Sequence, residues 1–175
     1  MSETQMKTGK LTTTQQLTIT AIFIALTFLA TWLIKVQIPF FAAKGGLIHL
    51  GNVPLFIAAM MYGKKTGAIA GAFGMALFDL MGGWILWAPF TFVVVGCMGF
   101  AVGLICEKSR LNPHLTNIIA VAAALVIKIV GYYIAEGIIY GNWIAPMASI
   151  PGNVIQVVTA GIIVLPIIER IKRMA

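Results

Sequence analysis

The chain has 175 residues, of which 60% are hydrophobic and only 10% are charged, and its formal net charge is +7. A typical soluble domain has about 25% charged residues, so this composition excludes a water-covered surface and predicts an integral membrane protein. The excess of positive charge does not indicate a nucleic-acid partner, because Lys and Arg form short clusters between long apolar runs instead of one basic face.

Charged and turn-forming residues divide the chain into six predicted transmembrane helices. They form a single all-α membrane domain over residues 1–175, which includes a polar tail, 1–13. The first span, 14–36, belongs to an uncharged run that is long enough to cross a bilayer and too long for a signal peptide, so we expect it to be retained. The second span, 50–62, is short and is expected to lie beside a re-entrant loop. The later spans are 66–82, 88–106, 116–139 and 151–171.

Glycines at four-residue spacing mark the third and fourth spans, with Gly67 and Gly71 in one and Gly99 and Gly103 in the other. Small residues at this spacing let helices approach closely inside lipid, so ordinary close packing within the bundle is the expected role of these glycines. A turn is predicted at 63–65, between the second and third spans.

The basic residues predict the orientation of the chain. An even number of spans places both termini on one side of the membrane, and most Lys and Arg residues fall on that side. Lys35 and Lys44 fall in the loop on the other side. Cytoplasmic loops carry the excess of basic residues, so we expect both termini in the cytoplasm. The residues on the expected cytoplasmic side are Lys7, Lys10, Lys64, Lys65, Lys108, Arg110, Arg170, Lys172 and Arg173.

Asp79 falls inside the third predicted span, and Lys128 and Glu136 fall inside the fifth. Each charge is unfavourable at the bilayer centre by roughly 2.5–3.5 kcal/mol, so a role is expected for it. At about 1.5 Å per residue, Asp79 and Lys128 lie at nearly the same depth and could form an ion pair. Such a pair either joins two helices or belongs to a binding site. Tyr132 shares a helix face with Lys128 and Glu136, and Glu136 is expected close to the outer surface.

Further polar and aromatic residues are expected in the same outer half of the membrane. A few polar groups among aromatic side chains are typical of a small-molecule pocket. Individually, the tryptophans could form only an interfacial belt, and His49 could be satisfied by the backbone. The predicted substrate-binding residues are His49, Asp79, Trp84, Trp87, Lys128, Tyr132, Glu136, Asn153 and Gln156.

The motifs of several enzyme classes are missing from the sequence. There is no G-x-x-x-x-G-K-[ST] loop, so the chain cannot hydrolyse ATP by a P-loop, and no H-E-x-x-H or G-x-S-x-G motif is present. We expect no catalytic residue, no metal and no cofactor. The paired broken helices of a secondary transporter are not evident either. A binding protein that depends on a partner for energy is therefore the favoured interpretation, ahead of a stand-alone carrier or an intramembrane enzyme.

Several stretches resemble the substrate-binding S components of energy-coupling factor (ECF) vitamin transporters. They are "HLGNVP" from His49, "GAIAG" from Gly67 and "PGN" from Pro151. The resemblance covers the whole chain. It implies a six-helix S-component bundle in the cell membrane, surrounded by the lipid bilayer. It also implies a transmembrane T component and two cytoplasmic ATPase subunits as partners.

The same resemblance implies roles for two further parts of the chain. Ala21 and Ala25 match the A-x-x-x-A motif by which S components dock on the T component. The first outer loop, 37–49, is expected to gate the pocket.

The chain is most similar to S components of the hydroxymethylpyrimidine type, which implies hydroxymethylpyrimidine or a pyridoxine-like compound as ligand. Thiamine, riboflavin or another vitamin stays an alternative, because a shared fold does not determine the ligand.

Overall fold

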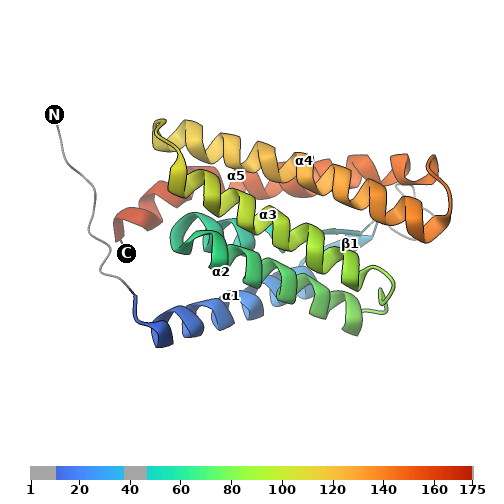
Figure 1. The fold of residues 1–175 in the computed structure, drawn as a ribbon, viewed down its shortest axis with the longest axis horizontal. Helices are drawn as coiled ribbons and strands as arrows, with labels where there is room; N and C mark the ends of the chain where they lie inside the picture. Colours follow the sequence, from blue (N-terminus) through green and yellow to red (C-terminus); the bar gives the residue numbers. More distant parts are fainter. Residues whose placement is uncertain (1–10, 38–46, 175) are drawn as a thin grey trace.

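The structure is a computed structural model that describes residues 11–37 and 47–174. Within these residues the chain forms helices that run along a common direction, with a short hairpin at one end of the bundle (Figure 1). The start of the first helix and the end of the last lie together at the opposite end. The elements are α1 (Thr13–Leu33), β1 (Lys35–Gln37), β2 (Leu47–His49), α2 (Asn52–Met81), α3 (Ala88–Lys108), α4 (Pro113–Tyr140), η2 (Ala145–Ser149) and α5 (Ile150–Met174).

Helix α2 reverses direction at Gly63, whose φ of 87° and ψ of 179° are not helical. A Cβ added at Gly67 would meet Ala59, and one added at Gly71 would meet Leu55. In a continuous helix those pairs would be roughly 12 and 24 Å apart along the axis. The two halves, 52–62 and 64–81, therefore fold back on each other.

The predicted turn at 63–65 is thus shorter than expected. Glycine adopts a positive φ without steric penalty, so one residue is enough to reverse the chain. Lys64 already belongs to the returning half. Its backbone N–H donates to Glu107 Oε1 at 2.9 Å, and its Nζ donates to Glu107 Oε2 at 2.7 Å. Glu107 on α3 therefore holds the first turn of the returning half in place.

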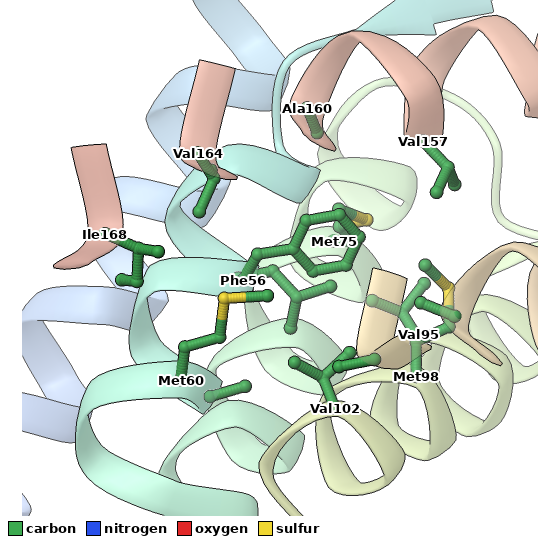
Figure 2. Packing of buried hydrophobic residues seen from close by; sticks show 14 of the residues in the cluster. Phe56, Met60, Met75, Val95, Met98, Val102, Val157, Ala160, Val164 and Ile168 are labelled. Atoms are coloured by element: carbon green, nitrogen blue, oxygen red, sulfur yellow. The ribbon is translucent and has the colours of Figure 1, made fainter. Parts of the chain in front are cut away.

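The first half of α2 lies at the centre of the hydrophobic core. Figure 2 shows Phe56 and Met60 of this half beside Met75 of the other half. The surrounding residues come from α3 and α5, and they are Val95, Met98, Val102, Val157, Ala160, Val164 and Ile168. This half is shorter than a bilayer is thick, at about 16 Å for eleven residues, and neighbouring helices surround it.

The chain departs from an all-α fold at β1 and β2, which pair antiparallel with Val36 opposite Ile48. Helix α1 therefore ends at Leu33 and not at the predicted residue 36, because residues 35–37 pair with β2 instead of continuing the helix. Strands β1 and β2 form the two ends of the predicted gating loop, 37–49, whose middle, 38–46, lies outside the described residues. The predicted tail lies outside them as far as residue 10, and so do Lys7, Lys10 and Lys44.

The helices of the described chain have the length and composition of a membrane protein. Four segments are long and apolar enough to cross a membrane: Thr13–Leu33, Ala88–Lys108, Pro113–Tyr140 and Ala145–Met174. Large apolar side chains such as Leu17, Leu33 and Ile162 are exposed on them, as expected of surfaces that face lipid. The number of spans and the side on which the termini lie stay predictions.

The close packing expected of α2 and α3 is visible in their glycines. A Cβ at Gly99 would clash with the backbone of Gly67, and one at Gly103 would clash with the backbone of Lys64. No other side chain fits at these two points without moving the helices apart. The short approach distance is the one that small residues permit between helices in lipid.

Gly99→Ala is therefore expected to destabilise the bundle by about 1–3 kcal/mol, because the added methyl group would force two backbones apart. Gly96→Ala, one turn earlier on α3, is the matched control. Its Cβ would lie 3.3 Å from the Cβ of Ala72, which requires only a small adjustment, and the change favours the helix. Thermal unfolding in detergent measures both variants, and equal melting temperatures would contradict the close approach at Gly99.

Candidate functional site

A cavity lies at the hairpin end of the bundle, where several elements meet. It encloses about 600 Å³ of empty space, its open mouth included, which is within the usual range of small-molecule sites. All the residues predicted to bind substrate lie on its wall. The wall consists of Leu47, His49, Phe78, Asp79, Trp84, Trp87, Thr91, Lys128, Tyr132, Glu136, Ser149, Gly152, Asn153 and Gln156.

Helix α4 provides three of these side chains at four-residue intervals: Lys128, Tyr132 and Glu136. Residues four apart lie on one face of a helix, so the spacing brings them to the same cavity. Helix α5 provides Asn153 and Gln156 by the equivalent three-residue spacing. The periodicity seen in the sequence is thus the reason why these residues converge.

The predicted ion pair between Asp79 and Lys128 is wrong. Among the described residues no ion pair within 4.0 Å joins these two side chains. Lys128 is only 1% exposed, and its Nζ donates to Gln156 Oε1 at 3.0 Å. The prediction rested on equal depth along two helices, and depth does not determine the direction in which a side chain points.

Asp79 is 8% exposed, and its Oδ2 is buried without a hydrogen-bond partner among the described residues. Buried polar atoms in proteins are almost always hydrogen-bonded, so this oxygen is unusual. A carboxylate accepts hydrogen bonds and does not donate them. The cavity wall therefore contains a carboxylate oxygen that no described residue is hydrogen-bonded to.

Two further polar pairs join elements around the cavity. Tyr132 Oη lies 3.1 Å from Thr91 Oγ1 on α3, and Ser149 Oγ donates to Glu136 Oε2 at 2.7 Å. Glu136 is buried, although it was expected near the outer surface, because the 3-10 helix η2 and its Ser149 cover it. The covering residues belong to segment 141–150, between the fifth and sixth predicted spans, which the sequence predicts to be only a turn.

Aromatic rings line the mouth and one wall of the cavity. Trp84 and Trp87 meet edge to face with ring centroids 5.4 Å apart, and Trp87 contacts Tyr140 in the same way at 6.1 Å. Both tryptophans lie in the connection between α2 and α3, at the end of the bundle, which is also where an interfacial belt is expected.

His49 reaches the cavity from strand β2, where its Nδ1 accepts the backbone N–H of Gly51 at 3.2 Å. Burial, and then the charge of Lys128, hold the pKa of His49 well below its usual range. The imidazole is therefore neutral at pH 7, and with Nδ1 as an acceptor its proton lies on Nε2. His49 was expected to be hydrogen-bonded by the backbone. Among the described residues this holds for Nδ1 and not for Nε2.

Sequence reasoning missed five residues of the wall. Phe78 and Gly152 adjoin predicted residues in the chain, and Thr91 lies one helical turn after Trp87, so their neighbours could have indicated them. Leu47 and Ser149 depend on the hairpin and on η2. No pattern in the sequence predicts either element.

Ala21 and Ala25 are distant in sequence from the residues of the cavity wall, and both are exposed on α1. A different side of α1 is buried through Thr27 and Thr31, and Thr27 contacts the position where Gly74 lacks a side chain. The two alanines are therefore accessible and form a flat surface one helical turn long.

Helices with an apolar exterior and a polar cavity at one end define a membrane protein that binds a small molecule. Comparison with known proteins identifies the family. The sequence model described as "ECF-type riboflavin transporter, S component" matches residues 11–173, and the chain belongs to this family. The resemblance seen in the sequence is thereby confirmed. The chain is a multi-pass membrane protein and an S component of a vitamin transporter, a family in which the ATPase role belongs to partner subunits.

Individual relatives agree with this assignment. The chain is 31% identical over 159 residues to the thiamine precursor transporter HmpT of Lactococcus lactis subsp. cremoris, with 89% of each chain covered. It is also 28% identical over 134 residues to an uncharacterized protein of Pyrococcus woesei, covering 77% of this chain and 85% of that one. A solved S component of a bacterial ECF transporter has the same fold, with a TM-score of 0.72 at 18% identity, covering 93% of this chain and 98% of that chain.

Removal of the Ser149 hydroxyl tests the polar contact with Glu136. Ser149→Ala is expected to destabilise the protein by about 1–3 kcal/mol, because it leaves a buried carboxylate without its donor. The double change Glu136→Leu with Ser149→Ala removes both partners and should recover most of the loss. Melting temperatures in detergent measure the effect, and a Ser149→Ala variant as stable as the unchanged protein would contradict it.

Proposed function

We propose that this chain captures hydroxymethylpyrimidine, or a pyridoxine-like compound, for an ECF-type importer. The observation that carries the proposal is the buried Asp79 carboxylate, whose Oδ2 has no partner among the described residues, in a cavity walled in part by aromatic rings. The similarity to a protein named as a thiamine precursor transporter supports the same choice.

The chemistry of the cavity suits a small aromatic heterocycle. Asp79 accepts a hydrogen bond from an amino or hydroxyl group, and the Nε2–H of His49 and the Nζ of Lys128 donate to a ring nitrogen or a hydroxyl oxygen. Trp84 and Tyr132 offer faces or edges for stacking on the ring. Hydroxymethylpyrimidine carries an amino group, ring nitrogens and a hydroxyl, and pyridoxine carries hydroxyls and one ring nitrogen. Thiamine and riboflavin are larger alternatives within the same family.

The proposal includes the organisation of the transporter. The chain is a single domain with six spans, in which both halves of α2 count separately, and both termini lie in the cytoplasm. A T component docks on Ala21 and Ala25, and two ATPase subunits provide the energy. The exposure of both alanines supports this docking surface, as does the burial of a different side of α1.

Asp79→Leu tests the ligand site, because binding and stability should change in opposite directions. The variant removes a buried carboxylate oxygen that has no partner in the described part of the chain, so its melting temperature should rise. Its affinity for hydroxymethylpyrimidine should fall about tenfold to a hundredfold, as expected for the loss of a charged hydrogen bond. Calorimetric titration with hydroxymethylpyrimidine, pyridoxine, thiamine and riboflavin measures the affinity and identifies the preferred ligand.

The double change Lys128→Met with Asp79→Leu is the control for any attraction between the two charges. If the two residues only stabilise the fold, the double variant should be stable and bind with full affinity. If they belong to the site, it should be stable and bind weakly. Full affinity in a stable double variant would remove Asp79 and Lys128 from the proposed site.

Ala21→Trp and Ala25→Trp test the coupling to partners. Each indole would project from the flat surface of α1, so uptake of the vitamin by cells should be abolished. Binding by the isolated chain should be unchanged, because neither position belongs to the cavity wall and both are exposed. Val126→Trp, at an exposed position on α4, is the matched control and should transport normally. Normal uptake by both alanine variants would contradict the docking surface.

A further inference from the structure

Gln156 joins two parts of the site that lie far apart in the sequence. Its Oε1 accepts from Lys128 Nζ at 3.0 Å, and its Nε2 donates to the backbone carbonyl of Leu47 at 2.7 Å. The side chain is only 5% exposed. One amide on α5 thus connects the buried cation of α4 with strand β2 of the hairpin.

The two partners of Gln156 allow only one orientation of its side-chain amide. An ammonium group only donates hydrogen bonds, and a backbone carbonyl only accepts them. The amide oxygen must therefore face Lys128 and the amide nitrogen must face Leu47. A side chain held at both ends in this way is suited to fix the positions of its partners.

The other polar contacts described for the hairpin connect it to α1 and α2 and not to α5. Lys35 Nζ lies 4.5 Å from the centre of the Trp32 ring and 4.9 Å from that of Phe78, and the N–H of Leu50 donates to Ile34. Among the hydrogen bonds of the described chain, the one from Gln156 is the only one that connects the hairpin to α5.

We propose that Gln156 is a positioning residue, which holds strand β2 against α5 and aims Lys128, so that the wall formed by Leu47 and His49 stays over the ligand. This inference rests on the proposed function of the cavity and refines it. The sequence suggested Gln156 as a ligand contact. The geometry assigns its two polar atoms to the protein itself, so its effect on the ligand is on residence time.

Two substitutions separate the two contacts of Gln156. In Gln156→Glu, a carboxylate oxygen can still accept from Lys128, but the other oxygen faces the carbonyl of Leu47 and cannot donate to it. The contact with β2 is lost, while the contact with Lys128 gains a charge. In Gln156→Met, a side chain of similar size loses both contacts.

Hydrogen exchange of the backbone amides in 47–49 measures the attachment of β2 in the ligand-free chain. Exchange should become about twofold to tenfold faster in Gln156→Glu, as expected for the loss of one hydrogen bond, and at least as fast in Gln156→Met. The melting temperature of Gln156→Glu should stay at or above that of the unchanged protein, because Lys128 keeps a partner. A local change without global destabilisation is what distinguishes positioning from a general role in stability.

The dissociation rate of hydroxymethylpyrimidine gives the second readout, measured by displacement from the purified full chain. It should rise by a similar factor, about twofold to tenfold, in Gln156→Glu. Asn153→Asp is the matched control, since Asn153 lines the same cavity on the same helix and no hydrogen bond of the described residues joins it to β2. Its exchange at 47–49 should equal that of the unchanged protein, whatever happens to its affinity.

Three outcomes would overturn the inference. They are unchanged exchange at 47–49 in both Gln156 variants, equally fast exchange in Asn153→Asp, and faster exchange with an unchanged dissociation rate. Failure of the proposed function is a separate result. If the unchanged chain binds no hydroxymethylpyrimidine, the exchange measurement still decides whether Gln156 holds β2, and the dissociation rate is then measured with whichever heterocycle the titrations identify.

Discussion

The reversal of the chain at Gly63 is the constraint on which the rest of the structure depends. A residue with a side chain would be strained at a φ of 87°, and the carboxylate of Glu107 binds both the backbone and the ammonium group of the residue that follows. Because of this sharp reversal, Asn52 at the start of α2 and Asp79 near its end lie at the same end of the bundle. The hairpin that precedes α2 and the loop that follows it can then form one cavity. A wider turn would separate the two halves and the close contacts between them.

The cavity is held together by hydrogen bonds that each cross between elements. Thr91 and Tyr132 join α3 to α4, Ser149 and Glu136 join η2 to α4, and Gln156 joins α5 to both α4 and β2. Buried polar groups of this kind are unfavourable unless they are paired, and the pairing makes their positions specific. Asp79 Oδ2, which bonds to no residue that the structure describes, departs from this arrangement, and it is the atom on which the proposed recognition of a ligand depends.

Sequence reasoning succeeded where a single helix carried the information. The four-residue spacing of Lys128, Tyr132 and Glu136 is enough to bring them to one face, and the glycines of α2 and α3 are enough to indicate close packing. The class of protein follows from composition, because an apolar exterior leaves few alternatives.

The errors arose where the outcome depends on two elements at once. The partner of Lys128 is determined by the rotation of α4 against α5, which no spacing along either helix reveals. Strands β1 and β2 are three residues long and acquire their structure from each other, so neither has a periodic pattern to detect. Glu136 is buried by η2, and the sequence of that segment, Ala-Pro-Met-Ala-Ser, gives no sign that it will cover a carboxylate.

The core that surrounds the first half of α2 affects how a ligand could pass through the molecule. Phe56, Val157 and Ile168 belong to one cluster of buried side chains that pack together in the interior of the described bundle (Figure 2). Such interiors are packed as densely as organic crystals, so the described core leaves no space for a ring-sized molecule. Under the proposed function, a vitamin held in the cavity would be separated from the opposite end of the described bundle by packed side chains, and its release there would require the cavity itself to be reoriented.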